Sequence, residues 1–224
     1  MSIIVRDVGQ TDYEPVWRAM QAFTDARDED TADEIWFTEH RPVFTLGVNA
    51  SREHLLAPGD IPVVQIDRGG QVTYHGPGQL MIYPLIDLRR AGIGVRALVT
   101  ALEESVVCLA ADSLVDAASR SDAPGVYVAG QKLASVGLRI RRGASFHGMA
   151  LNVDVDLEPF SRINPCGFKD LAVTDLNSLG IGLDLEAARD QLLPHLLRHL
   201  GLENETIEYA DAELPAAPAA SANL

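Results

Sequence analysis

The sequence lacks the patterns on which most nucleotide and metal sites depend. It has no G-x-x-x-x-G-K-[ST] phosphate loop, no strand-led G-x-G-x-x-G, no H-E-x-x-H and no C-x-x-C. These patterns supply the backbone amides and the side-chain ligands that hold phosphates and metal ions. We therefore expect neither a cofactor nor a bound metal.

Positive charge is also scarce. The 224 residues include 18 Lys and Arg against 32 Asp and Glu, a formal net charge of -14. Such a surface repels phosphate backbones, and the basic residues do not gather into a stripe that would offset the repulsion. Nucleic acid is not expected as a partner.

Long apolar runs and cysteines are few. No run approaches membrane-spanning length, and the first residues do not resemble a signal peptide, so we expect a cytoplasmic protein with no membrane partner. A chain of this kind keeps its two cysteines reduced. Cys108 lies in an apolar helical pattern typical of a buried packing residue, whereas Cys166 lies between Pro165 and Gly167, where we expect a loop.

The pattern of apolar residues predicts one mixed α/β domain of the α+β class over residues 1–213. This prediction rests on the order of the elements: groups of strands are separated by helices, without a regular βαβ alternation. The expected strands are 3–8, 35–40, 43–48, 61–67 and 80–88, with a further β group at 125–153; the expected helices are 13–27, with Asp12 as its cap, 95–114 and 185–200, the last ended by Gly201. Residues 214–224, rich in Pro and Ala, are expected to be a disordered tail.

The densest unusual segment runs from Arg68 to Gln79, RGGQVTYHGPGQ. Glycine lets backbone N–H groups approach a ligand, and the interleaved polar side chains supply directed contacts at the rim of an apolar pocket. Gly-Pro-Gly is also ordinary turn chemistry, so a hairpin with tight turns is the alternative.

Two further segments carry candidate chemistry. Lys132 precedes an expected hairpin and sits among small apolar residues, an unusual place for a solvated amine, although most lysines are surface residues. Within that hairpin Leu138 and Ile140 alternate with Arg139 and Arg141, which predicts outward-facing arginines. A thiol at Cys166 becomes a nucleophile if a neighbouring positive group favours its thiolate, but most free cysteines only fill space.

Together these three segments resemble the lipoyl(octanoyl) transferase family. The resemblance covers about residues 33–180, and the family signature R-G-G-x-x-T-[aromatic]-H-x-P-G-Q is met in full by residues 68–79. The family's activating lysine falls on Lys132 in Gly-Gln-Lys-Leu-Ala-Ser-Val-Gly, and its acyl-accepting cysteine falls on Cys166 in Asn-Pro-Cys-Gly. The resemblance implies the fold of the catalytic domain of biotin and lipoate protein ligases.

The resemblance also implies a ping-pong transfer without ATP. Cys166 takes octanoyl from octanoyl-acyl carrier protein, and a lysine of a lipoyl domain then takes it from the enzyme. The implied acceptors are the E2 subunits of 2-oxoacid dehydrogenases and the glycine cleavage H protein. Lys132 serves both steps, and backbone N–H groups near Gly167 or in two expected turns, 135–137 and 148–150, stabilise the oxyanion. The residues implied to line the acyl site are Arg68, Gly69, Gly70, Gln71, Val72, Thr73, Tyr74, His75, Ser135, Val136, Gly137, Gly148, Met149 and Ala150.

Three other interpretations remain open. An ATP-dependent lipoate–protein ligase on the same fold would need no cysteine, and a lipoyl amidotransferase would use one. A binding module that has kept the pocket would show binding without transfer. His75 is an alternative base, although the motif favours a positioning role. Independently of the family, Arg139, Arg141 and Arg142 form either a docking patch for the acidic carrier protein or a solvated strand face.

Overall fold

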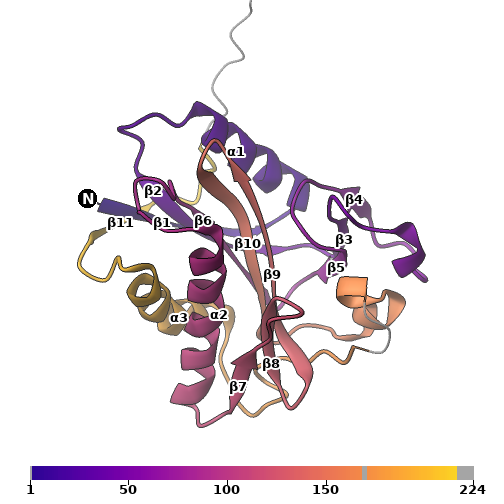
Figure 1. Ribbon diagram of the computed structural model, residues 1–224. Helices are drawn as coiled ribbons and strands as arrows, with labels where there is room; N and C mark the ends of the chain where they lie inside the picture. The colour runs from indigo at the N-terminus through magenta and orange to yellow at the C-terminus, as the bar shows by residue number, and fades with distance from the viewer. Residues whose placement is uncertain (1, 168–170, 216–224) are drawn as a thin grey trace, which may run out of the picture.

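The structure is a computed structural model that describes residues 2–167 and 171–215, and for Cys166 the backbone alone. Its centre is an eight-stranded mixed sheet in the order β11-β1-β2-β6-β10-β9-β8-β7 (Figure 1). The strands of this sheet are β1 (Ser2–Thr11), β2 (Asp33–His40), β6 (Gln79–Leu85), β7 (Ala117–Ser119), β8 (Gly125–Val128), β9 (Gln131–Arg141), β10 (Ala144–Asn152) and β11 (Thr206–Ala210). β1 is parallel to β2 and β11, and the remaining pairs are antiparallel.

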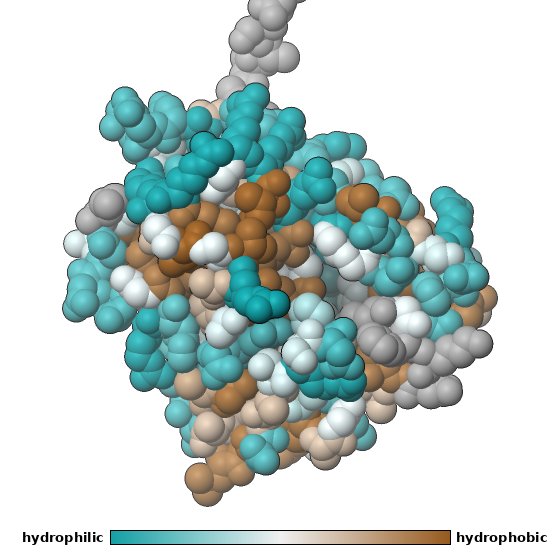
Figure 2. Space-filling model, viewed as in Figure 1, coloured by the Kyte–Doolittle hydropathy of each residue, from teal (hydrophilic) through white to brown (hydrophobic). Residues whose placement is uncertain are grey.

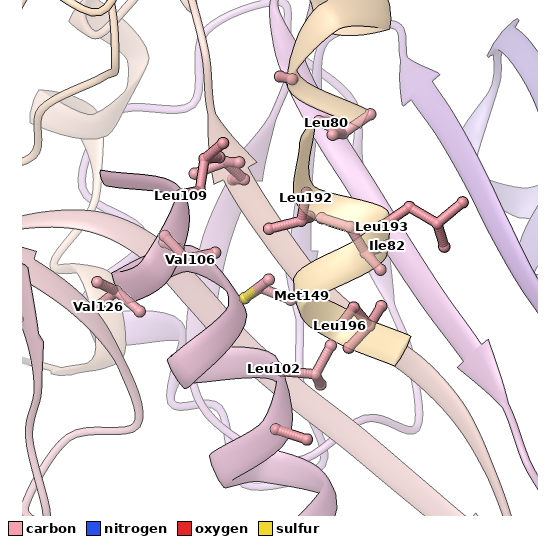
Figure 3. Packing of buried hydrophobic residues seen from close by; sticks show 14 of the residues in the cluster. Leu80, Ile82, Leu102, Val106, Leu109, Val126, Met149, Leu192, Leu193 and Leu196 are labelled. Atoms are coloured by element: carbon pink, nitrogen blue, oxygen red, sulfur yellow. The ribbon is translucent and has the colours of Figure 1, made fainter. Parts of the chain in front are cut away.

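Helices α2 (Val95–Asp112) and α3 (Leu185–Leu200) cover one face of the sheet. Figure 3 shows their leucines meeting Leu80, Ile82 and Met149 of the central strands. The apolar residues of each helix recur every three or four positions, which places them on one face. α3 begins where the Asp184 side chain accepts the Ala187 N–H, 2.8 Å away, and ends at Gly201 with φ 71°.

Helix α1 (Tyr13–Ala26) packs on the opposite face, over β2, β6 and β10. Val16, Trp17 and Met20 contact Trp36, Tyr83 and Phe146 there. Because helices cover both faces, β6 is buried along its whole length, which explains its unbroken apolar run. Leu214, the first residue of the expected tail, also packs against this cluster.

A small sheet lies beside the large one, in the order β4-β3-β5. It comprises β3 (Val43–Leu46), β4 (Val63–Gln65) and β5 (Val72–His75), and three short 3-10 helices pack near it: η1 (Arg52–His54), η2 (Glu158–Arg162) and η3 (Pro165–Gly167). β3 and β5 share a core with Phe160 and Ile163. The glycine-rich motif, residues 68–79, therefore connects β5 of the small sheet to β6 of the large one.

The predicted mixed fold and all three helices are confirmed, with some corrections. Residues 72–75 and 79–85 form no hairpin, because β5 pairs with β3 whereas β6 pairs with β2 and β10. Asp12 stands at the start of α1 but does not cap it with its side chain, which forms an ion pair with Arg41. The short strands β7 and β11 were not predicted. Residues 216–224 lie outside the described residues, so a tail there stays a prediction.

Candidate active site

A cavity opens between the large sheet and the small one, and Figure 2 shows this face hollowed between the surface over β9 and the surface over the small sheet. It holds about 470 Å³ of empty space when its open mouth is included. Half-buried residues form its rim and fully buried ones its floor. The lining residues are Tyr13, Arg68, Gly70, Gln71, Val72, Thr73, His75, Met81, Tyr83, Ser135, Val136, Gly137, His147, Gly148, Met149 and Ala150.

Most residues implied by the family signature come together here, but Gly69 and Tyr74 do not line the cavity. Gly69 donates its N–H to the Leu138 carbonyl at 3.0 Å, which ties the motif to β9. Tyr74 points into the small core, against Phe44 and Phe160. These two positions support the cavity wall from behind.

Arg68 is buried and organises one wall of the cavity. Its guanidinium donates to the carbonyl and the hydroxyl of Thr45, both at 2.8 Å, and to the Gly69 carbonyl at 2.9 Å. Gly137 lets β9 pass close to it, since a Cβ on Gly137 would lie 3.0 Å from Cδ of Arg68. The guanidinium is thus held by hydrogen bonds to backbone carbonyl oxygens and to a hydroxyl oxygen.

His75 has both ring nitrogens occupied. The Gln79 amide donates to Asn152 at 2.8 Å, so its oxygen accepts from Nδ1–H of His75 at 2.7 Å. Nε2 then accepts from the Thr45 hydroxyl, 3.2 Å away. Burial holds the pKa of His75 well below its usual value. The ring is therefore neutral and has no lone pair to offer a substrate.

The floor of the cavity contains residues that the sequence analysis missed. Nε2 of His147 donates to the Asp67 carboxylate at 2.8 Å, and Nδ1 lies 3.3 Å from the Tyr13 hydroxyl. Although burial opposes ionisation of Asp67, hydrogen bonds from His147, Gln21 and Trp17 hold its pKa well below the usual range. Burial lowers the pKa of His147 despite Asp67. His147 also has φ 58°, an unusual backbone for a residue with a side chain.

The segments 135–137 and 148–150 are paired strands, not the turns we expected. Ser135 faces Ala150 and Gly137 faces Gly148 in the β9–β10 ladder. A Cβ on Gly148 would lie 1.9 Å from the Ile82 carbonyl oxygen, so this position requires glycine. These strands form one wall of the cavity, and an oxyanion site in a turn is not found there.

Lys132 is 2% exposed and sits at the start of β9. Its Nζ donates to the Pro124 carbonyl at 3.1 Å and lies 5.4 Å from the centre of the Tyr127 ring. A Cβ on Gly125 would lie 3.3 Å from this Nζ, and Gly125 is paired with Ser135, a cavity residue. The amine therefore lies beside the Ser135 end of the cavity.

Glu103 of α2 also lies close to Lys132. Its carboxylate accepts the Gly125 N–H at 2.7 Å. Burial raises the pKa of Glu103, while that hydrogen bond and the charge on Lys132 act in the opposite direction. Glu103 thus fixes the start of β8, the strand against which the lysine packs.

Cys166 lies in η3, and its side chain is outside the described part of the structure. The neighbouring backbone is close to the cavity, since a Cβ on Gly167 would lie 3.5 Å from Cγ of Gln71 and 3.4 Å from Nε2 of His54. The Gly167 N–H donates to the Asn164 carbonyl at 3.0 Å, so in this conformation it is not available to an oxyanion. After residues 168–170, the chain returns to Lys132, whose N–H donates to the Ala172 carbonyl at 2.8 Å.

Two other kinds of site are absent from residues 2–167 and 171–215. No helix there has both the length and the apolar character needed to cross a membrane. In the same residues no three His, Cys, Asp or Glu side chains are grouped so that they could hold a metal ion.

The chain matches the family described as the lipoyl protein ligase A/B catalytic domain over residues 12–197. It belongs to this family. The octanoyltransferase of Chromobacterium violaceum is 54% identical over 206 residues, which cover 92% of this chain and 100% of that protein. The octanoyltransferase of Stutzerimonas stutzeri is 58% identical over 197 residues, 88% of this chain and 90% of the relative.

Several solved structures share the fold. A lipoate-protein ligase A bound with ATP has a TM-score of 0.72 at 14% identity, covering 94% of this chain and 89% of that one. A bipartite lipoate protein ligase from Thermoplasma acidophilum has a TM-score of 0.67 at 16% identity, with 94% and 85% covered. A biotin protein ligase from Aquifex aeolicus scores 0.53 at 10% identity, with 92% and 72% covered. The expected ligase-like fold is confirmed.

Proposed function

We propose that this protein transfers octanoyl from octanoyl-acyl carrier protein to a lysine of lipoyl domains, through a thioester on Cys166. The observation that carries the proposal is the buried amine of Lys132 at the Ser135 end of the cavity. Identities of 54% and 58% to octanoyltransferases support the acyl group. The proposed acceptors are lipoyl domains of 2-oxoacid dehydrogenase E2 subunits and the glycine cleavage H protein.

In the first step the Cys166 thiolate attacks the thioester carbon, the bond to the carrier's sulfur breaks, and that sulfur takes a proton from Lys132 and leaves as a thiol. A positive charge on Lys132 favours the attacking thiolate. In the second step the ε-amine of the acceptor attacks the acyl-enzyme. Lys132, now neutral, takes its proton, and Cys166 leaves as thiolate. Amide formation drives the sequence forward without ATP.

His75 positions the acyl site in this mechanism and does not act as its base. Both of its nitrogens are engaged, by Gln79 and by Thr45. The same chain of hydrogen bonds continues through Asn152 to the Thr174 carbonyl at 2.9 Å, and the Thr174 N–H donates to the Lys132 carbonyl at 3.0 Å. A rigid polar support therefore joins the signature motif to the backbone of the proposed base.

Intact-protein mass spectrometry after mixing with octanoyl-acyl carrier protein tests the proposal. Wild type should gain one octanoyl group that hydroxylamine removes, Cys166→Ser should gain none, and Lys132→Ala should gain it slowly. Cys108→Ser is the matched control, because Cys108 lies on α2 and does not line the cavity. This variant should behave as wild type. Acylation of a lipoyl domain without an adduct would refute the thioester, and a requirement for ATP would favour a ligase.

A further inference from the structure

The cavity has a direction, set by the register of β9 and β10. Lys132 lies beside the Ser135–Ala150 pair, and the ladder continues through Gly137–Gly148 to Leu138–His147. An antiparallel strand advances about 3.4 Å per residue, so the path from Ser135 to Leu138 is about 10 Å. This matches an extended octanoyl chain whose thioester lies at the Lys132 end.

At the far end the cavity is closed by the ring of Tyr13. The side chain is 4% exposed and projects from the first residue of α1. It stacks on His75 with ring centres 5.4 Å apart and an interplanar angle of 14°. Its hydroxyl is held by His147 at 3.3 Å. The ring is therefore fixed on its face and at its tip.

His147 is itself held in place, so the closure is rigid. Asp67 accepts its Nε2–H at 2.8 Å, and the same carboxylate accepts the Trp17 indole at 2.7 Å and the Gln21 amide at 3.1 Å. Trp17 and Gln21 belong to α1, as Tyr13 does. Moving Tyr13 aside would break its buried hydrogen bond to a histidine that this network holds in place, and a longer hydrocarbon could not replace that bond.

We propose that Tyr13, held by His147, sets the upper limit of acyl chain length that this enzyme accepts. The proposal rests on the proposed function, because it takes the acyl-enzyme as its readout. Tyr13 acts here as a specificity-determining residue: it leaves the reacting atoms alone and excludes the methylenes beyond the eighth carbon.

The test compares rates of acyl-enzyme formation with small thioesters of hexanoate, octanoate, decanoate and dodecanoate, followed by intact-protein mass spectrometry. Tyr13→Leu opens the far end and keeps an apolar helix former. Tyr13→Met is a second, unbranched variant in case the first folds poorly. Met20→Ala is the matched control, because Met20 is a buried residue of the same helix and cluster that does not line the cavity.

Wild type should prefer octanoate over decanoate. In Tyr13→Leu and Tyr13→Met the decanoyl-to-octanoyl rate ratio should rise about tenfold or more, since each further buried methylene is worth about fourfold. Met20→Ala should lower thermal stability and leave the ratio unchanged. An unchanged ratio in folded Tyr13 variants, or an equal rise in Met20→Ala, would overturn the inference while the proposed function stood. Absence of any adduct on wild type would instead remove the proposed function itself.

Discussion

Gly125 and Lys132 are packed so closely that a Cβ on Gly125 would lie 2.8 Å from Cε of Lys132. The same Cβ would lie 2.3 Å from the Ala134 carbonyl oxygen, and Gly125 has φ 136°. A glycine on β8 is thus what allows a lysine to be buried at the start of β9. The environment of the proposed base is built by a residue outside the family motifs quoted for this chain.

Gly125→Ala should therefore displace the lysine. We expect a loss of about 2 kcal/mol or more in the free energy of unfolding, from the strained backbone, together with a severe loss of acyl-enzyme formation. Urea unfolding and the mass-spectrometric assay measure the two effects. Gly182→Ala is the control, because Gly182 has nothing within 4 Å of an added Cβ and should change neither quantity. Normal acylation by Gly125→Ala would contradict the proposed role of this packing.

Thr45→Val should weaken the acyl site without altering its volume. The hydroxyl accepts from Arg68 and donates to His75, so its removal leaves the buried Nε2 of His75 without its donor. We expect the free energy of unfolding to fall by about 1–3 kcal/mol, and the KM for an octanoyl thioester to rise. Thr45→Ser keeps the hydroxyl and should retain most of both. Equal behaviour of the two variants would show that the hydroxyl is dispensable.

Stability should fall as the pH drops below about 6.5. Burial lowers the pKa of His40 to about 4 and holds the pKa values of His75 and His147 below their usual value as well. Between pH 6.5 and 4 these histidines bind protons in the unfolded chain but stay neutral in the folded protein. Each histidine then adds a slope of up to about 1.4 kcal/mol per pH unit, with stability fully present above pH 6.5.

Urea unfolding between pH 7.5 and 4.5 measures this slope. His40→Gln should make it shallower, whereas His199→Gln, a change at an exposed residue of α3, should not. A stability that stays flat down to pH 5 in wild type would contradict neutral burial of these rings.

Arg139→Glu should separate carrier-protein docking from chemistry. Arg139 is exposed on β9, whereas Arg141 forms an ion pair with Asp25 at 3.0 Å and Arg142 donates to the Asp25 carbonyl at 3.1 Å. Arg139 is therefore the cleaner test of the proposed patch. We expect the KM for octanoyl-acyl carrier protein to rise severalfold, and more steeply at low salt, with little change for a small octanoyl thioester. Equal effects on both substrates would remove the patch.

The elements that could be predicted are those with a strong local pattern. α3 is predicted to the residue because leucines recur on one face up to Gly201, which ends the helix. β7 and β11 were missed because they are short, largely exposed edge strands without clear alternation. The strand that pairs with β5 could not be predicted from the sequence. Glycine and proline indicate a turn after β5, but they do not show which strand forms hydrogen bonds with it.

The residues of the candidate site also divide into those that could have been predicted from the sequence and those that could not. Asp67 and His147 are the immediate neighbours of Arg68 and Gly148, so a wider reading of the motifs would have found them. Tyr13 carried no such signal, because at the start of an amphipathic helix it looks like any core residue.

By itself, the sequence determined the family and the mixed fold and singled out Lys132 and Cys166 as candidates, because these depend on short motifs and on periodic burial. Only the tertiary structure decided that Lys132 is buried beside the Ser135 end of a cavity, that His75 has no free nitrogen, and that Tyr13 lines the same cavity. Those facts depend on contacts between residues far apart in the chain, such as Thr45 with His75 and Tyr13 with His147. Local patterns carry no information about such distances.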